Sequence, residues 1–176
     1  MNLKIAAIIA LTILTTSCAN LVPLSTALIE KNKWTKDDMK KIQYYTSGDI
    51  TLQKVSSSGG SNIEGGVIKM ESSKSVSEVS IKQNTKGIAV GFPNDNVAVS
   101  FEKDDNHFLT FGANPDRNGY FVMLGTEWKD RIGKVTYNGE KYFSSPESRD
   151  VILLVNMKKI KKLQIDQRTA GGREIK

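Results

Sequence analysis

The side chains of this sequence that could most readily do chemistry are the thiol of Cys18 and the imidazole of His107, each the only one of its kind. A single histidine cannot build a multi-histidine metal centre. A Ser/His/Asp set would have to place His107 beside Asp104 or Asp105, with a serine brought in by folding. No Gly-x-Ser-x-Gly motif marks such a serine. The sequence therefore predicts no catalytic residue and no cofactor.

One segment resembles the opening of a calcium-binding loop. Asn114, Asp116 and Asn118 offer oxygen ligands at alternate positions before a glycine. The position where a calcium loop needs a bidentate glutamate is Gly125, and Arg117 adds positive charge among the ligands. Asn, Asp, Pro and Gly are also the residues that form long turns. We therefore expect a turn here and no metal site.

The strongest charge asymmetry is a basic cluster near the C-terminal end, formed by Lys158, Lys159, Lys161 and Lys162. The pattern around it predicts a half-exposed strand, in which these lysines divide between the two faces unless a turn lies near Ile160. Two interpretations stay open. The lysines could protect a sheet edge from aggregation, or they could contact anionic lipid or polymer.

Trp128 is the aromatic residue that stands apart from the alternating patterns, because it lies in the polar segment 125–130. A large aromatic side chain in such a segment either docks in a specific pocket or is exposed for binding. We expect Trp128 to dock.

The N-terminal segment has the features of an export signal. Lys4 precedes ten mostly apolar residues, 5–14, and the small polar run Thr15-Thr16-Ser17 leads to Cys18. The apolar stretch is shorter than the roughly 20 residues of a membrane-spanning helix and fits a signal peptide.

This segment resembles the lipobox of bacterial lipoproteins, although Thr15 stands where leucine is commonest. The resemblance implies cleavage before Cys18, whose thiol and amine would then carry acyl chains. We therefore expect a signal peptide over 1–17, a lipidated N-terminus and tether over 18–33, and a β-rich domain over 34–176. Ala19 differs from the aspartate of an inner-membrane retention signal, so the expected location is the outer membrane rather than the inner one.

Composition is that of a globular protein, with 25% charged and 39% hydrophobic residues. Removal of residues 1–17 leaves 159 residues, enough for one domain, with a charge near +5 once Lys4 is lost. For an envelope protein, such a charge indicates anionic lipid or cell-wall polymer as partner rather than nucleic acid.

Alternating hydrophobicity predicts an all-β fold. We expect a single sandwich or barrel of about nine or ten short, mostly antiparallel strands. Thr35 and Asp38 form a capping-box pattern that predicts one short N-terminal helix, ending near Lys41. Asn138-Gly139 predicts a hairpin with a type I′ turn, and Gly48 a bend within a strand that spans 42–52.

These observations favour a membrane-anchored, non-enzymatic binding or structural module of the cell envelope. Its partners would be membrane lipid through acylated Cys18, and another envelope protein or an anionic envelope polymer. Two alternatives remain. One is a small-ligand or lipid carrier in a β-barrel, with a cavity lined by Phe92, Phe101, Phe111 and Met123. The other is an envelope hydrolase that uses His107 or several carboxylates.

Overall fold

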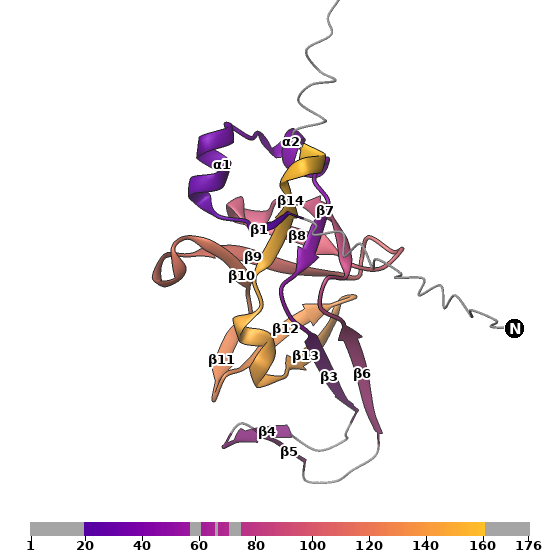
Figure 1. Ribbon diagram of the computed structural model, residues 1–176. Helices are drawn as coiled ribbons and strands as arrows, with labels where there is room; N and C mark the ends of the chain where they lie inside the picture. Colours follow the sequence, from indigo (N-terminus) through magenta and orange to yellow (C-terminus); the bar gives the residue numbers. More distant parts are fainter. Residues whose placement is uncertain (1–19, 57–60, 66, 71–74, 161–176) are drawn as a thin grey trace, which may run out of the picture.

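The computed structural model describes residues 20–56, 61–65, 67–70 and 75–160 of the 176-residue chain. The described part is an all-β domain with short helices (Figure 1). Its strands are β1 (Leu21–Pro23), β2 (Tyr44–Thr46), β3 (Ile50–Ser56), β4 (Ser61–Glu64), β5 (Val67–Met70), β6 (Ser75–Ile81), β7 (Lys86–Gly91), β8 (Val97–Ser100), β9 (Phe108–Asn114), β10 (Tyr120–Met123), β11 (Glu127–Lys129), β12 (Ile132–Tyr137), β13 (Glu140–Ser144) and β14 (Leu153–Asn156). The helices are α1 (Thr26–Asn32) and α2 (Lys36–Lys40), with the 3₁₀ turns η1 (Pro93–Asp95), η2 (Pro115–Arg117) and η3 (Pro146–Asp150).

All strand pairs in the described part of the chain are antiparallel, and all but one belong to two main sheets. One has the order β1-β14-β2-β7-β8-β9-β10, and the other has the order β11-β12-β13-β3-β6. The hairpin β4-β5 forms a separate pair. The described residues hold more strands than the nine or ten expected, because β1, β2 and β11 are only three residues long and carry too few side chains for a visible alternation.

The seven-stranded sheet closes on itself through the residues that follow β1. The amide of Phe121 in β10 donates to the Leu24 carbonyl at 3.0 Å, and the Thr26 amide donates to the Gly119 carbonyl at 3.2 Å. The Leu24 amide donates to the Leu153 carbonyl at 2.8 Å. The residues after β1 thus hydrogen-bond both to β14, near one end of the strand order, and to β10, at the other end.

The first described residues are therefore part of the domain, which corrects the tether expected over 18–33. Leu24 is completely buried. Ser25 caps α1, with its Oγ accepting from the Leu28 amide at 3.1 Å. The tether expectation failed from Asn20 onward because a three-residue strand followed by one short helix gives almost no periodic signal.

The segment 42–52, expected to be one bent strand, is two strands in different sheets. The bend at Gly48 separates β2 from β3, so the chain crosses from the seven-stranded to the five-stranded sheet there. Ser47 fixes the crossing, because its Oγ accepts from the Ile152 amide at 2.7 Å and its amide donates to the Ile152 carbonyl at 3.0 Å.

The interior is packed with large side chains. A Cβ on Gly87 would lie 2.5 Å from the Val99 side chain and 2.8 Å from the Phe101 ring, so glycine at this position leaves the room that these two side chains fill. Phe101 meets Phe111 edge-on at 6.1 Å. The residues expected to line a carrier cavity belong to this packing: Phe111 and Met123 are core residues, and Phe92 and Phe101 pack against the core.

Two local predictions are confirmed. Thr35 and Asp38 form the capping box of α2, with the Asp38 amide donating to Thr35 Oγ1 at 3.2 Å. Asn138 and Gly139 have φ values of 50° and 72°, as a type I′ turn between β12 and β13 requires.

The strand expected around Lys158–Ile165 is wrong where the structure describes it, because residues 157–160 are helical. Asn156 Oδ1 accepts from the amides of Lys158 and Lys159 at 3.1 and 3.4 Å, which caps this turn and turns the chain out of the sheet. None of the helices described is long and apolar enough to cross a membrane.

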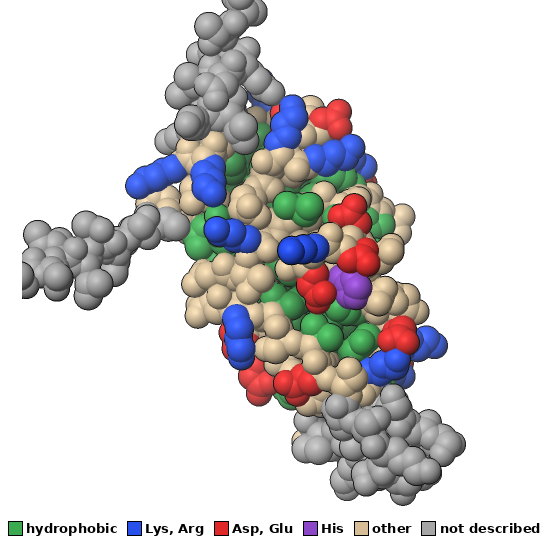
Figure 2. Space-filling view, turned by 90° about the vertical axis from the view of Figure 1, so that its right-hand side faces the viewer, with side chains coloured by type: hydrophobic (Ala, Val, Ile, Leu, Met, Phe, Trp, Pro, Cys, Tyr) green, Lys and Arg blue, Asp and Glu red, His purple; other side chains and the backbone are tan. Residues whose placement is uncertain are grey.

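The surface mixes charge with a few exposed apolar side chains. Basic side chains gather in the upper part of the face in Figure 2, and acidic ones lie next to the purple histidine. Among the residues that the structure describes, the exposed large hydrophobic ones are Ile88, Phe108 and Leu124.

The role of the first strand is tested by Leu24→Ala. Deletion of a fully buried leucine side chain costs about 2–5 kcal/mol, so we expect the free energy of unfolding to fall by that amount in urea titrations. Ile88→Ala, at a position 50% exposed on β7, should change it by less than about 0.5 kcal/mol. Equal effects of the two variants would contradict the placement of Leu24 in the core.

Candidate functional site

A cleft of about 470 Å³ lies where the two main sheets approach each other. One wall comes from the turn η2 and the strand β10, and the other from β11, the β11–β12 turn and η3. Its lining combines three arginines, two other polar residues and four apolar side chains: Arg117, Arg131, Arg149, Asn114, Asp116, Val122, Met123, Leu124 and Trp128.

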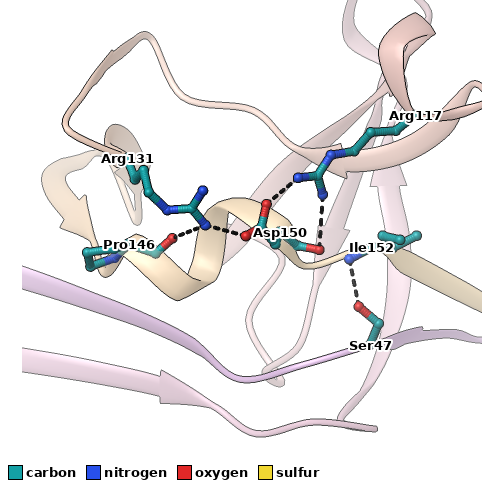
Figure 3. A network of polar contacts seen from close by, with 6 residues as sticks. All are labelled: Ser47, Arg117, Arg131, Pro146, Asp150 and Ile152. Carbon is teal, nitrogen blue, oxygen red and sulfur yellow. Dashed lines mark hydrogen bonds and ion pairs between the residues drawn. The ribbon is translucent and has the colours of Figure 1, made fainter.

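Asp150, at the end of η3, holds two of these arginines in place (Figure 3). Arg117 Nη2 donates to Asp150 Oδ1, and Arg131 Nη2 donates to Asp150 Oδ2. Arg131 also donates to the Pro146 carbonyl at 3.4 Å. The hydrogen bonds from Arg131 and then Arg117 hold the pKa of Asp150 below its usual range. One carboxylate therefore orients two guanidinium groups that come from different sheets.

The turn η3 that carries Asp150 is itself fastened to the five-stranded sheet. Ser148 is completely buried, and its Oγ accepts from the Thr51 amide at 3.0 Å. Beyond Asp150, the Ser47–Ile152 hydrogen bond fixes the start of β14 (Figure 3). These contacts give the Asp150 carboxylate a defined position.

Trp128 forms the aromatic wall of the cleft. It lies directly opposite Gly133 in the β11–β12 pair, and a Cβ on Gly133 would come within 2.8 Å of the indole ring. The guanidinium carbon of Arg149 lies 5.5 Å from the ring centroid, a cation–π contact. The indole is thus held between a glycine backbone and a guanidinium, which agrees with the expected docking of Trp128.

Arg131 has an unusual backbone conformation for its residue type. Asp130 and Arg131 form the two-residue β11–β12 turn with φ values of 48° and 69°. The second position of such a turn favours glycine, and a residue with a long side chain is uncommon there. The fold accepts this strain where the guanidinium reaches Asp150 and the cleft.

The distribution of arginines singles out this cleft. Arg117, Arg131 and Arg149 are all the arginines between residues 20 and 160, the outer limits of the described chain, and all three line it. The lining includes no lysine. Guanidinium groups present planar pairs of N–H donors that match a carboxylate or phosphate. The cleft therefore has the chemistry to bind an anionic group beside an apolar one.

A smaller pocket of about 240 Å³ adjoins the cleft at Leu124, which lines both. Its walls include Phe108 and Val135. Leu124 and Phe108 are each 37% exposed, so apolar surface continues from the arginines along β9 and β12.

The calcium-like turn is used for its own geometry. Asn114 Oδ1 accepts from the Asp116 amide at 2.9 Å, and Asn118 takes the left-handed conformation with φ 54°. The described residues contain no group of three or more His, Cys, Asp or Glu side chains placed to hold a metal. Asp116 and Arg117 contribute instead to the cleft wall.

His107 lies away from the cleft. Its Nδ1 is 3.6 Å from Asp104 Oδ2 and has no hydrogen-bond partner within the described chain, and its ring meets Tyr137 edge-on at 5.3 Å. Burial and the neighbouring Glu102 carboxylate raise the pKa of Tyr137. Ser100, the nearby serine at the end of β8, places its Oγ within hydrogen-bond distance of the Glu102 and Asp104 carbonyls.

The remaining predicted site residues fall at the ends of the described chain. Lys158 and Lys159 are exposed in the helical turn after β14. Lys161, Lys162 and Cys18 lie outside the described residues. Sequence reasoning missed the arginine cleft; the available signal was that only five of the 25 basic residues are arginines and that three of them fall within 117–149.

Comparison with family models, with curated proteins and with solved structures finds no match for this chain.

Asp150→Asn tests the clamp. A surface ion pair contributes about 0.2–1 kcal/mol, so loss of two should lower the free energy of unfolding by about 1 kcal/mol at pH 7. Because the folded-state pKa of Asp150 is depressed, its contribution is complete above the ordinary carboxyl pKa and is lost as pH falls through the folded-state value. Urea titrations from pH 7 to pH 2 should show wild type and variant converging at the acid end. An unchanged difference at low pH would contradict the clamp, and Asp105→Asn, at an exposed aspartate outside the cleft, is the matched control.

Proposed function

We propose that this chain is a lipid-anchored, non-enzymatic binding module of the bacterial cell envelope, and that its cleft binds a carboxylate-bearing segment of another envelope protein. The observation that carries the proposal is the convergence of Arg117, Arg131 and Arg149 on a cleft that Trp128 and Leu124 also line. The anchor is proposed from the lipobox-like Thr15-Thr16-Ser17-Cys18, with the outer membrane as the expected location.

The choice of a protein partner follows from the mixture of side chains. Trp, Arg and Met are enriched at protein–protein interfaces, whereas Lys is depleted. The cleft has the first three types and lacks the fourth among its lining residues. The adjoining apolar surface at Leu124 and Phe108 suits a hydrophobic side chain next to the acidic one.

Preorganisation supports binding through this cleft. Asp150 orients two guanidinium groups, and the indole ring of Trp128 supports the third. Side chains that are already ordered lose little conformational entropy when a ligand arrives. Each guanidinium has further N–H donors for a bound carboxylate.

Binding accounts for the described residues better than the two alternatives do. A hydrolase would need a free nucleophile beside His107, and Ser100 Oγ is already within hydrogen-bond distance of two backbone carbonyls. A carrier would need space between Phe101 and Phe111, whose rings are in edge contact. These observations favour the binding module.

The anchor is tested with Cys18→Ser. We expect mass spectrometry of the mature wild-type protein to find acyl groups on Cys18 and residues 1–17 removed. The variant should lose the acyl groups and move from the membrane fraction to the soluble fraction, because two or more acyl chains are needed for durable anchoring. An unmodified wild-type Cys18 would contradict the anchor.

The cleft is tested by photocrosslinking in cells. A benzophenone amino acid in place of Leu124, between the two pockets, should give a discrete protein adduct, and the same probe in place of Ile88 on β7 should not. Arg149→Gln should reduce the Leu124 adduct by about tenfold or more, because a hydrogen bond to a charged group contributes about 1.5–3 kcal/mol and each 1.4 kcal/mol is a factor of ten. Arg149→Lys keeps the charge without the planar fork and should retain part of the adduct.

Three results would count against this assignment. An adduct of equal strength from Ile88 would show that capture is independent of the cleft. A protease-resistant, heterogeneous adduct at Leu124 would identify an envelope polymer instead of a protein. No effect of Arg149→Gln, with its circular dichroism spectrum unchanged, would remove the arginines from the binding role.

A further inference from the structure

The start of the described chain lies beside the basic turn that ends it. Leu21 pairs with Asn156, and the Met157 amide donates to the Asn20 carbonyl at 3.3 Å. Lys158 and Lys159 follow Met157 directly and are both exposed. Residues at opposite ends of the described sequence are thus brought together by the β1–β14 pair.

The turn that carries these lysines is held firmly at both ends. Asn156 Oδ1 caps it through the amides of Lys158 and Lys159. Ile160 is 5% exposed and belongs to the same core cluster as Met39 and Ile42. The two lysines therefore point to solvent from a fixed position next to Asn20.

Covalent geometry limits how far this end can lie from Cys18. Only Ala19 lies between Cys18 and Asn20. The two Cα atoms are therefore two steps apart, and an extended chain spans at most about 3.6 Å per step, hence about 7 Å. This largest distance between Cys18 and Asn20 is close to the Debye length, which is roughly 8 Å at physiological ionic strength. Charges beside Asn20 would interact with the headgroups of any bilayer that holds acyl chains on Cys18.

We infer that the end of the domain formed by Asn20 and residues 157–160 is a membrane-apposed face, with Lys158 and Lys159 in contact with anionic lipid headgroups. This inference rests on the proposed acylation of Cys18. It deepens the proposed function by fixing the orientation of the domain, since a chain with a long tether could take any orientation.

This orientation leaves the arginine cleft accessible. In Figure 1 the turn after β14 and helix α2 lie together at the top, whereas β11 lies at the lower left. β11 and the neighbouring turns line the cleft. The membrane-apposed face and the cleft are therefore on different parts of the domain.

Lysine acetylation footprinting of the purified full-length mature protein tests the inference, after its intact mass has established whether Cys18 is acylated. The probes are vesicles of phosphatidylcholine with and without phosphatidylglycerol, compared with detergent. On anionic vesicles we expect Lys158 and Lys159 to react about fivefold more slowly than in detergent, the factor that corresponds to the attraction of one lysine to an anionic surface. Lys129 and Lys141, on β11 and β13, should react at nearly unchanged rates.

A charge-reversed variant provides the second measurement. Lys41 is the C-cap of α2, and α2 and the turn after β14 both lie at the top of Figure 1, so Lys41 lies at the same end of the domain as Lys158 and Lys159. The double variant Lys158→Glu/Lys159→Glu should abolish the protection of Lys41 on anionic vesicles. The matched control Lys129→Glu/Lys141→Glu should preserve it.

The outcomes separate this inference from the anchor itself. An acylated protein whose Lys158 and Lys159 react as fast as Lys129 would retain the anchor and overturn the membrane-apposed face. Protection without acylation would retain the face and contradict the anchor. Protection that is equal for all four lysines would overturn the defined orientation, because it would mean general adsorption.

Discussion

The structure depends on the closure of the seven-stranded sheet by the residues after β1. Leu24 receives a hydrogen bond from β10 and donates one toward β14, while its side chain is completely buried. Apart from the bridge between Val122 and Ile152, the facing edges of β14 and β10 would lack partners without this segment, and unpaired strand edges are templates for aggregation. The N-terminal segment is therefore structural, and any force applied through an anchor at Cys18 would act directly on the sheet.

A second constraint is the single carboxylate of Asp150, which links the two main sheets. Arg117 reaches it from the turn between β9 and β10, and Arg131 reaches it from the turn between β11 and β12. Each contact is exposed and weak alone. Together they fix the distance between the two turns, which sets the width of the cleft. They also hold Arg131 in its left-handed backbone conformation.

The sequence revealed those features that depend on local chemistry. The capping box of Thr35 and Asp38 and the turn at Asn138-Gly139 form as predicted, because both are satisfied by residues within one turn of chain. The short closing strand and the crossing at Gly48 were not predictable in this way, since they depend on pairing with β14, more than 100 residues away. The cleft was missed for the same reason: its arginines look like isolated surface charges until folding places them around Asp150.

Lysine and arginine side chains differ in how they can hold an anion. A lysine ammonium is a compact, strongly hydrated charge on a flexible stem, suited to a diffuse anionic surface. A guanidinium is planar and can be oriented by one carboxylate while it keeps donors for another. Lys158 and Lys159 lie beside the start of the described chain, whereas the three described arginines line the cleft. Under the proposed function, the domain presents exposed lysines where contact with a bilayer needs no fixed geometry, and guanidinium donors where recognition of a carboxylate requires it. Under the proposed function, that difference accounts for the convergence of all three arginines between residues 20 and 160 on one cleft.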